Sequence, residues 1–246
     1  MTRLVAPAKL TLGLRITGLR HDGYHLIDAE MVTLDFHDTL EVRSGSGLVI
    51  EGPARGDSIG PDRDNLVLRA LRLIDRDAAV TITKRIPAGA GLGGGSADAA
   101  AILRWAGFTD LEAAAALGAD VAFCLVGGRA RVTGIGEQVA PLPFVEQTFT
   151  LVTPPVFCST PAVYSAWDDM GGPVGANGND LEPAALVVAP ELVRWRDELA
   201  AATDQQPRLA GSGSTWFVEG AHPEAGRIVT TVPTERPVDW ASQEER

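Results

Sequence analysis

The feature that most constrains this chain is a glycine-rich segment between a predicted strand and a predicted helix. Residues 89–95 read Gly-Ala-Gly-Leu-Gly-Gly-Gly, with a β-branched run at 79–84 before them and an alanine-rich run at 97–105 after them. Without side chains, the backbone N–H groups of such a loop can close on an anion, and the positive end of the following helix adds to the attraction. A flexible linker rarely lies so tightly between two regular elements. The segment therefore predicts a phosphate-binding loop.

Two better-known glycine motifs compete for these residues. Gly89, Gly91 and Gly94 satisfy the G-x-G-x-x-G pattern of dinucleotide-binding proteins. However, residues 84–87 separate the glycines from the strand, and Glu112, the acidic residue at the expected distance, does not end a strand. A Walker A loop needs a lysine after its last glycine, and none follows here. The loop therefore fits neither motif, although a Rossmann-type oxidoreductase stays open as a weaker alternative.

Strand-like and helix-like runs are mixed along the chain without the regular alternation of a parallel α/β sheet, which predicts an α+β fold. β-type runs lie between residues 4 and 42, interrupted by a turn at 18–23, and a helix capped by Asp64 is expected over 65–75. Residues 127–139 are typical of a hairpin. Pro141 and Pro143 then mark a hinge, so we expect an N-terminal lobe at 1–144 and a C-terminal lobe at 145–246.

The charge balance limits the class of ligand. The formal net charge is -11, so phosphate polymers and anionic membranes are repelled, and neither nucleic acid nor membrane is an expected partner. Cys124 and Cys158 lie in apolar stretches, which favours free buried thiols in a reducing compartment over a disulfide. Pro7 and Lys9 interrupt the apolar run that a signal peptide needs, so a cytoplasmic location is expected. The histidines lack metal-ligand spacing, and no protein metal site is predicted.

Three charged residues stand out by their positions. Asp120 interrupts the apolar run 113–128, where a carboxylate is costly unless it has a partner or a function. It can cap a helix over 121–126, and such a cap could coexist with a role in catalysis. Lys9 and Lys84 are the only lysines among the 21 basic residues. Chance placement on the surface and a role at a site both stay open for these two lysines.

Three segments together resemble the superfamily of galactose, homoserine, mevalonate and phosphomevalonate kinases: residues 7–10, 87–98 and 209–214. Further segments resemble, within it, the 4-diphosphocytidyl-2-C-methyl-D-erythritol kinases of the non-mevalonate isoprenoid pathway: Gly18 with 22–25, then 64–66, 118–121 and 179–182. The resemblance implies a ribosomal-protein-S5-like N-terminal lobe and a ferredoxin-like C-terminal lobe, with the active site between them. It also implies ATP, Mg²⁺ and a small substrate in which cytidine diphosphate is joined to a polyol.

The same resemblance implies roles for individual residues. Asp120 matches the catalytic aspartate and Lys9 its partner lysine, which suits phosphoryl transfer because that reaction needs a carboxylate near the acceptor hydroxyl and a cation beside the developing charge. The implied ATP-binding residues are Asn65, Lys84, Pro87, Gly89, Gly91, Leu92, Gly93, Gly94, Gly95, Ser96 and Ala97. The implied substrate-binding residues are Thr11, Tyr24, His25, Gly211 and Ser212.

Within the substrate set, Tyr24 and His25 match the residues that hold the cytosine, and Thr11 stands where the family usually has a substrate-contacting asparagine. The residues alone leave a packed turn equally open for Tyr24 and His25. We therefore expect an ATP-dependent kinase that phosphorylates the 2-hydroxyl of 4-diphosphocytidyl-2-C-methyl-D-erythritol. A kinase of another small alcohol and a catalytically impaired nucleotide-binding protein are the remaining alternatives.

Overall fold

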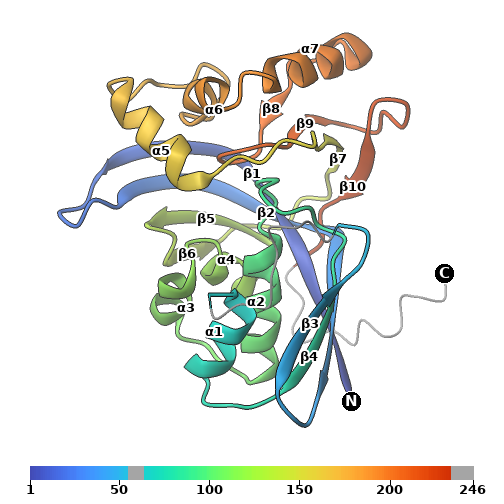
Figure 1. The fold of residues 1–246 in the computed structure, drawn as a ribbon. Helices are drawn as coiled ribbons and strands as arrows, with labels where there is room; N and C mark the ends of the chain where they lie inside the picture. The colour runs from blue at the N-terminus through green and yellow to red at the C-terminus, as the bar shows by residue number, and fades with distance from the viewer. Residues whose placement is uncertain (55–63, 234–246) are drawn as a thin grey trace.

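The structure, a computed structural model, describes residues 1–54 and 64–233, which form two lobes of mixed helix and strand (Figure 1). The N-terminal lobe is built on a six-stranded sheet with the order β3-β4-β2-β5-β6, and β1 pairs with β2. Only the β3–β4 pair is parallel. The strands are β1 (Thr2–Leu19), β2 (His25–Arg43), β3 (Gly47–Glu51), β4 (Ala79–Thr83), β5 (Arg129–Gly134) and β6 (Gln138–Pro141).

The long β1–β2 hairpin carries the first site residues. Its pairing shifts register between Pro7 and Lys9, and again between Thr11 and Gly13. Such irregularities bend a strand and redirect its side chains, and they are common beside active sites. The two polar side chains Lys9 and Thr11 are both buried here, on a strand that otherwise buries alanine and leucine. Lys9 is therefore not the surface residue that chance placement implies.

Helices cover one side of this sheet (Figure 1). The central one is α2, whose run of alanines lets it pack closely between its neighbours, and residues 97–103 are all buried. One predicted cap is wrong: α1 begins after Asn65, not Asp64, and the Asn65 carboxamide oxygen accepts a hydrogen bond from the Val67 N–H at 2.9 Å. The helices are α1 (Leu66–Leu73), α2 (Gly94–Trp105), α3 (Leu111–Leu117) and α4 (Val121–Val126).

The C-terminal lobe is an antiparallel four-stranded sheet, with the order β10-β7-β9-β8, and three helices. Its strands are β7 (Thr148–Val152), β8 (Arg208–Leu209), β9 (Trp216–Glu219) and β10 (Arg227–Thr230), and its helices are α5 (Thr160–Asp169), α6 (Glu182–Val188) and α7 (Leu192–Thr203). The predicted α+β, two-lobed architecture is confirmed. The boundary predicted at 144/145 falls between β6 and β7, and the division into domains stays a prediction.

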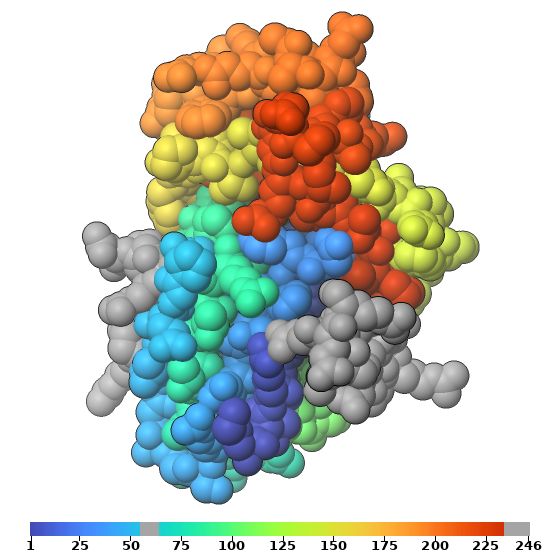
Figure 2. Space-filling view, turned by 90° about the vertical axis from the view of Figure 1, so that its right-hand side faces the viewer, coloured from blue at the N-terminus to red at the C-terminus, as the bar shows by residue number. Residues whose placement is uncertain are grey.

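The two lobes share an apolar core. It joins Leu10 and Val32 of the hairpin to Phe149 and Phe217 of the C-terminal sheet. Figure 2 shows the red C-terminal strand region reaching down beside the blue N-terminal strands. There the Thr230 N–H and hydroxyl both donate to the Asp35 carboxylate, at 2.9 and 2.7 Å. In the described residues no helix is long and apolar enough to cross a membrane.

Candidate active site

A cleft of about 930 Å³ is lined by β1, the glycine loop, the start of α4, helix α5 and the turn at 210–213. It brings together nearly all of the residues expected from the sequence. The predicted residues that line it are Lys9, Thr11, Tyr24, His25, Asn65, Lys84, Pro87, Gly89, Gly91, Gly93, Gly94, Gly95, Ser96, Asp120, Gly211 and Ser212. Leu92 and Ala97 are the exceptions, because both side chains are fully buried in the apolar cores.

In the glycine loop, residues with buried apolar side chains alternate with glycines. Gly89, Gly91 and Gly93 have φ between 68° and 76°, a left-handed conformation that favours glycine. Between them, Ala90 and Leu92 bury their side chains in the core shared by the two lobes. Any contact of Leu92 with a nucleotide would therefore be made by its backbone. The loop is held from below by its apolar residues while its glycines face the cleft.

The loop leads directly into the N-terminus of α2. Gly93 is the N-cap and has no side chain with which to satisfy the first N–H groups of the helix. Unpaired N–H groups at a helix start, together with the helix dipole, form an anion site. A Cβ at Gly91 would lie 2.2 Å from the carbonyl oxygen of Ala210, and one at Gly93 would lie 2.8 Å from Cγ of Lys9. Glycine allows these close approaches of the loop to Ala210 and Lys9, and the binding of nucleotide phosphates by the loop stays a prediction.

Lys9 and Asp120 form an ion pair at the cleft, with Lys9 Nζ 3.1 Å from Asp120 Oδ2. Lys9 also donates from Nζ to Thr11 Oγ1 at 3.0 Å, and its backbone N–H donates to the carbonyl of Leu92 at 3.0 Å. Asp120 precedes α4 but makes no side-chain cap hydrogen bond. The interpretation of its carboxylate as a helix cap is therefore wrong. The side chain of Asp120 is 29% exposed, so the pair presents one carboxylate to the cleft.

Lys84 has a different environment. Its ammonium donates to Asp38 and to Asp98 Oδ2, at 2.7 Å for Asp98, and all three residues are buried. Burial disfavours the charged ammonium, but attraction to Asp98 and Asp38 outweighs it and raises the pKa of Lys84 above its usual value. Burial also raises the pKa of Asp98, to about 7, against the opposing pull of Lys84. Lys84 is thus enclosed by two buried carboxyl groups, and its contact with adenine stays a prediction.

The turn at Tyr24 and His25 packs against α5. His25 Nε2 lies 2.8 Å from Asp168 Oδ1, and the His25 ring lies 4.8 Å from that of Tyr164, measured between centroids. Tyr24 is 59% exposed and has the Arg20 guanidinium 5.3 Å from its ring centroid. Burial raises the pKa of Tyr164, so its hydroxyl stays neutral. The ring of Tyr24 is accessible at this wall of the cleft. The binding role of Tyr24 and His25 stays a prediction.

Sequence reasoning missed the contribution of α5. Five of its residues line the cleft: Thr160, Pro161, Tyr164, Ser165 and Asp168. The sequence indicates a helix after Ser159, but its periodicity does not say which face meets a turn far earlier in the chain. The 143-residue separation between His25 and Asp168 shows that this wall is a product of the tertiary fold.

Comparisons with known proteins agree with this geometry. Residues 65–128 match the model of the GHMP kinases N terminal domain. A 4-diphosphocytidyl-2-C-methyl-D-erythritol kinase of Paracoccus denitrificans (strain Pd 1222) is 40% identical in an alignment that covers 87% of this chain and 85% of that protein. The chain belongs to this kinase family. A second relative, from Cereibacter sphaeroides (strain KD131 / KCTC 12085), is 38% identical and covers 98% of both chains.

Solved structures support the same family. A crystal structure of 4-(cytidine 5'-diphospho)-2C-methyl-D-erythritol kinase has a TM-score of 0.73 and 30% identity, and covers 94% of this chain and all of that one (100%). The L. major mevalonate kinase has a TM-score of 0.65 at 16% identity over 96% of this chain and 97% of that one, which shows the shared GHMP fold alone. The Rossmann-type alternative is wrong, because the N-terminal sheet is mainly antiparallel.

Proposed function

We propose that this chain is an ATP-dependent kinase that phosphorylates the 2-hydroxyl of 4-diphosphocytidyl-2-C-methyl-D-erythritol. The observation that carries the proposal is a single cleft lined by the glycine loop, the Lys9–Asp120 pair and the Tyr24–His25 turn. A phosphate site, a reaction centre and an aromatic wall are the three parts that a kinase of a nucleotide-linked alcohol needs. The proposed acceptor is the compound after which the related kinases are named.

ATP would place its phosphates against the glycine loop and the first turn of α2. The three left-handed glycines and the uncapped N-terminus offer backbone N–H groups to the phosphate oxygens. In a protein of net charge -11, such a site must attract the anion locally. Asn65 and Lys84 also line the cleft, where the family resemblance places adenine.

Mg²⁺ fits this site as an ion carried by the nucleotide. No three His, Cys, Asp or Glu side chains of residues 1–54 and 64–233 gather as metal ligands. Mg²⁺ in kinases is commonly bound through substrate phosphates, waters and only one or two protein oxygens, so a dedicated cage is not needed. The hydroxyl of Ser96 lines the same cleft and is the protein oxygen ligand that we propose. Mg²⁺ would neutralise charge on the phosphates during transfer.

Two residues, Asp120 and Lys9, have separate roles in the proposed reaction. The acceptor oxygen bonds to the γ-phosphorus as the bond to the β–γ bridging oxygen breaks, and ADP leaves. Asp120 orients the hydroxyl and takes its proton, while the Lys9 ammonium, held by Thr11 and Asp120, offsets negative charge on the transferring group.

An acceptor panel tests the proposal. We expect ADP release to depend on 4-diphosphocytidyl-2-C-methyl-D-erythritol and not on phosphomevalonate or homoserine. Turnover with either of the latter and not with the former would assign the chain to another alcohol, and no turnover with any would remove the activity.

A variant at the aromatic wall sharpens the acceptor assignment. Tyr24→Ala should raise the KM for the acceptor by roughly 5- to 150-fold, because base stacking on an aromatic ring is worth about 1–3 kcal/mol, while the KM for ATP stays close to the parent. Leu19→Ala is the matched control, since Leu19 is also exposed near the end of this hairpin but does not line the cleft. Equal changes in both KM values would contradict the cytosine site.

A further inference from the structure

A short segment of the C-terminal lobe, residues 178–180, is clasped to strand β1. The Leu14 N–H donates to the carbonyl of Gly178 and the Asp180 N–H donates to the carbonyl of Leu14, both at 2.9 Å. These bonds form a parallel bridge between Leu14 and Asn179. β1 is also the strand that carries Lys9. The clasp, residues 178–180, therefore fixes a piece of one lobe to the strand that holds the catalytic lysine.

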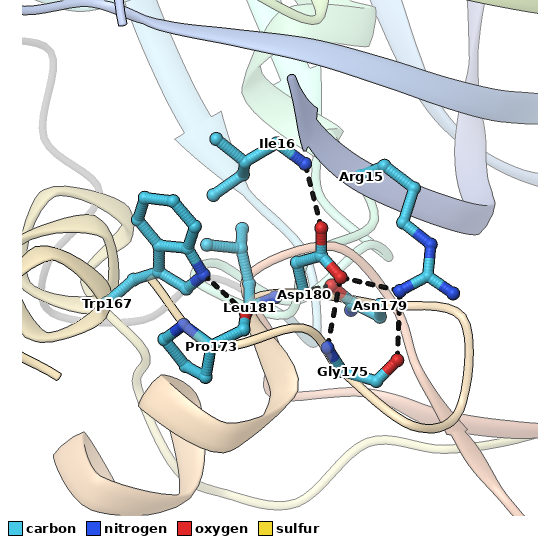
Figure 3. A network of polar contacts seen from close by, with 8 residues as sticks. All are labelled: Arg15, Ile16, Trp167, Pro173, Gly175, Asn179, Asp180 and Leu181. Carbon is cyan, nitrogen blue, oxygen red and sulfur yellow. Dashed lines mark hydrogen bonds and ion pairs between the residues drawn. The ribbon is translucent and has the colours of Figure 1, made fainter. Parts of the chain in front are cut away.

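Asp180 secures this clasp (Figure 3). Its Oδ2 accepts from the Ile16 N–H at 2.9 Å, and its Oδ1 accepts from Arg15 at 2.6 Å and from the Gly175 N–H at 3.0 Å. The side chain is 4% exposed, and charge-assisted bonds of this kind are among the stronger ones in proteins. The side chain of Asp180 thus faces β1, away from the bonds that its neighbour makes.

Asn179 faces the other way, toward the glycine turn at 209–214. Its Nδ2 donates to the carbonyl of Leu209 at 2.9 Å and to that of Gly211 at 2.7 Å. Its Oδ1 accepts from the Leu181 N–H at 3.0 Å. Asn179 is buried, so both amide hydrogens are committed to the turn and water does not replace them.

The turn that Asn179 holds lies against the reaction centre. A Cβ at Gly211 would lie 3.5 Å from Lys9 Nζ and 3.7 Å from Thr11 Oγ1. On its far side, the Ser214 N–H donates to the carbonyl of Gly89 at 3.2 Å. Gly211 and Ser212 both line the cleft. The turn thus contacts both the catalytic lysine and the phosphate loop.

These contacts close a circuit. β1 holds the clasp, Asn179 of the clasp holds the turn, the turn contacts the glycine loop, and Leu92 of that loop accepts from the Lys9 N–H on β1. We propose that Asn179 is a positioning residue that sets the turn at 209–214 against Lys9 and the glycine loop. The expected effect of Asn179 on turnover rests on the proposed phosphoryl transfer. The expected effect of Asn179 on the position of the turn is independent of that proposal.

Loss of the two amide donors should impair turnover more than binding. The carbonyls of Leu209 and Gly211 would lose their buried partner, and the turn would shift or become mobile. The glycine loop and α2 remain, so ATP still binds, but Lys9 loses a fixed neighbour where charge develops. We therefore expect a fall in kcat with little change in the KM for ATP.

The test compares Asn179→Ser with Asn177→Ser. Serine at 179 keeps an oxygen for the Leu181 N–H and removes both donors to the turn. Asn177 is the matched control because its Nδ2 donates to the carbonyl of Pro207, which is the same kind of bond two residues earlier on both sides. We expect kcat to fall by roughly tenfold or more in Asn179→Ser, with the KM for ATP within about threefold, and to stay within about twofold in Asn177→Ser.

Hydrogen–deuterium exchange tests the position of the turn without any substrate. Amide exchange in the peptide covering 208–216 should be about tenfold faster in Asn179→Ser than in the parent or in Asn177→Ser. Where the serine variant does not fold, Asn179→Asp keeps the side-chain volume and the bond from Leu181, and the same changes are expected. Unchanged exchange, unchanged kcat, or equal loss in both variants overturns the inference. A parent without turnover on the acceptor would instead overturn the proposed function.

Discussion

The two lysines of this chain, Lys9 and Lys84, are almost equally buried, at 4% and 3% exposed, yet they lie in opposite kinds of environment. Lys84 is enclosed by two buried carboxylates, Asp38 and Asp98. Lys9 has one carboxylate, Asp120, which is partly exposed to the cleft, and one hydroxyl. Burial alone therefore does not distinguish an enclosed cation from one that lies at the cleft.

The two lysines differ in where their polar partners lie. The Asp38–Lys84–Asp98 cluster joins β2, the end of β4 and helix α2, and Asp38 also accepts from the Ile86 N–H at 2.9 Å. It lies beneath the glycine loop, since a Cβ at Gly94 would be 3.2 Å from Lys84 Nζ. The Lys84 cluster thus supports the loop from inside, whereas the Lys9–Asp120 pair faces the cleft. The four predictions below test this contrast.

Asp120→Asn should give the largest effect. The amide keeps the size of the side chain but cannot take the hydroxyl proton, so kcat should fall by roughly 10²- to 10⁴-fold. Because Asp120 is partly exposed and its side chain makes no cap hydrogen bond, the melting temperature and ATP affinity should stay close to the parent. Steady-state kinetics, calorimetry with ATP and thermal unfolding check the three quantities. Turnover within a few-fold of the parent would remove Asp120 from the mechanism.

Lys84→Met should show the opposite pattern, with its main effect on stability. Removal of the ammonium leaves Asp38 and Asp98 buried and facing each other, which typically costs about 3–5 kcal/mol. Lys9→Met is the matched control, because it leaves a carboxylate that water can reach. Urea denaturation should therefore separate the two variants by several kcal/mol. Equal unfolding free energies would mean that the two lysines do not differ as described.

Thr11→Val tests how strictly Lys9 must be held. Valine has nearly the same shape but cannot accept the 3.0 Å hydrogen bond from Lys9 Nζ. A hydrogen bond to a charged group is worth about 1.5–3 kcal/mol, so kcat should fall by roughly 10- to 150-fold. Thr17→Val is the control, because Thr17 is on the same strand and its hydroxyl donates to the carbonyl of Leu26 at 3.2 Å, away from the cleft. If both variants keep normal kcat, Thr11 has no role in orienting Lys9.

The local parts of the fold follow from the sequence. The β-branched run and the alanine-rich run appear as β4 (Ala79–Thr83) and α2 (Gly94–Trp105), because hydrophobic periodicity and turn residues act over a few neighbours. The helix α6 and the strand β10 were not expected, since each is short and has little periodicity. The resemblance to the kinase family is confirmed by relatives that cover most of the chain.

The site divides in the same way. The glycine loop could be predicted because its chemistry is contained in consecutive residues. Two contacts could not be predicted: the one between His25 and Asp168 of α5, and the one between Asn179 and Gly211. They join residues that are 143 and 32 positions apart. The partners of Lys84 were hidden for the same reason: Asp38 lies 46 positions away. Sequence patterns identify the charged residues, and only the fold decides which of them neutralise one another.

The smallest predicted effect concerns the pH dependence of the Lys84 cluster. Asp98 has a pKa raised to about 7 by burial, whereas an aspartate in the unfolded chain titrates near ~3.9. The Oδ1 of Asp98 is buried without a hydrogen-bond partner among the described residues, which also disfavours its charged form. Between these two pKa values the native state keeps a proton that the unfolded state has released.

By linkage, this proton makes the unfolding free energy of the parent fall as the pH rises from about 4 to about 7, and the dependence ends above the folded pKa. Asp98→Asn cannot titrate, so the stability of the parent relative to the variant should be greatest near pH 4 and should decrease toward pH 7. Urea denaturation of both proteins at several pH values in this window measures the difference, because contributions from groups that do not interact with Asp98 cancel. A difference that is constant, or that grows with pH, would show that Asp98 is ionised in the native state, so that both carboxyl groups of the Lys84 cluster are charged.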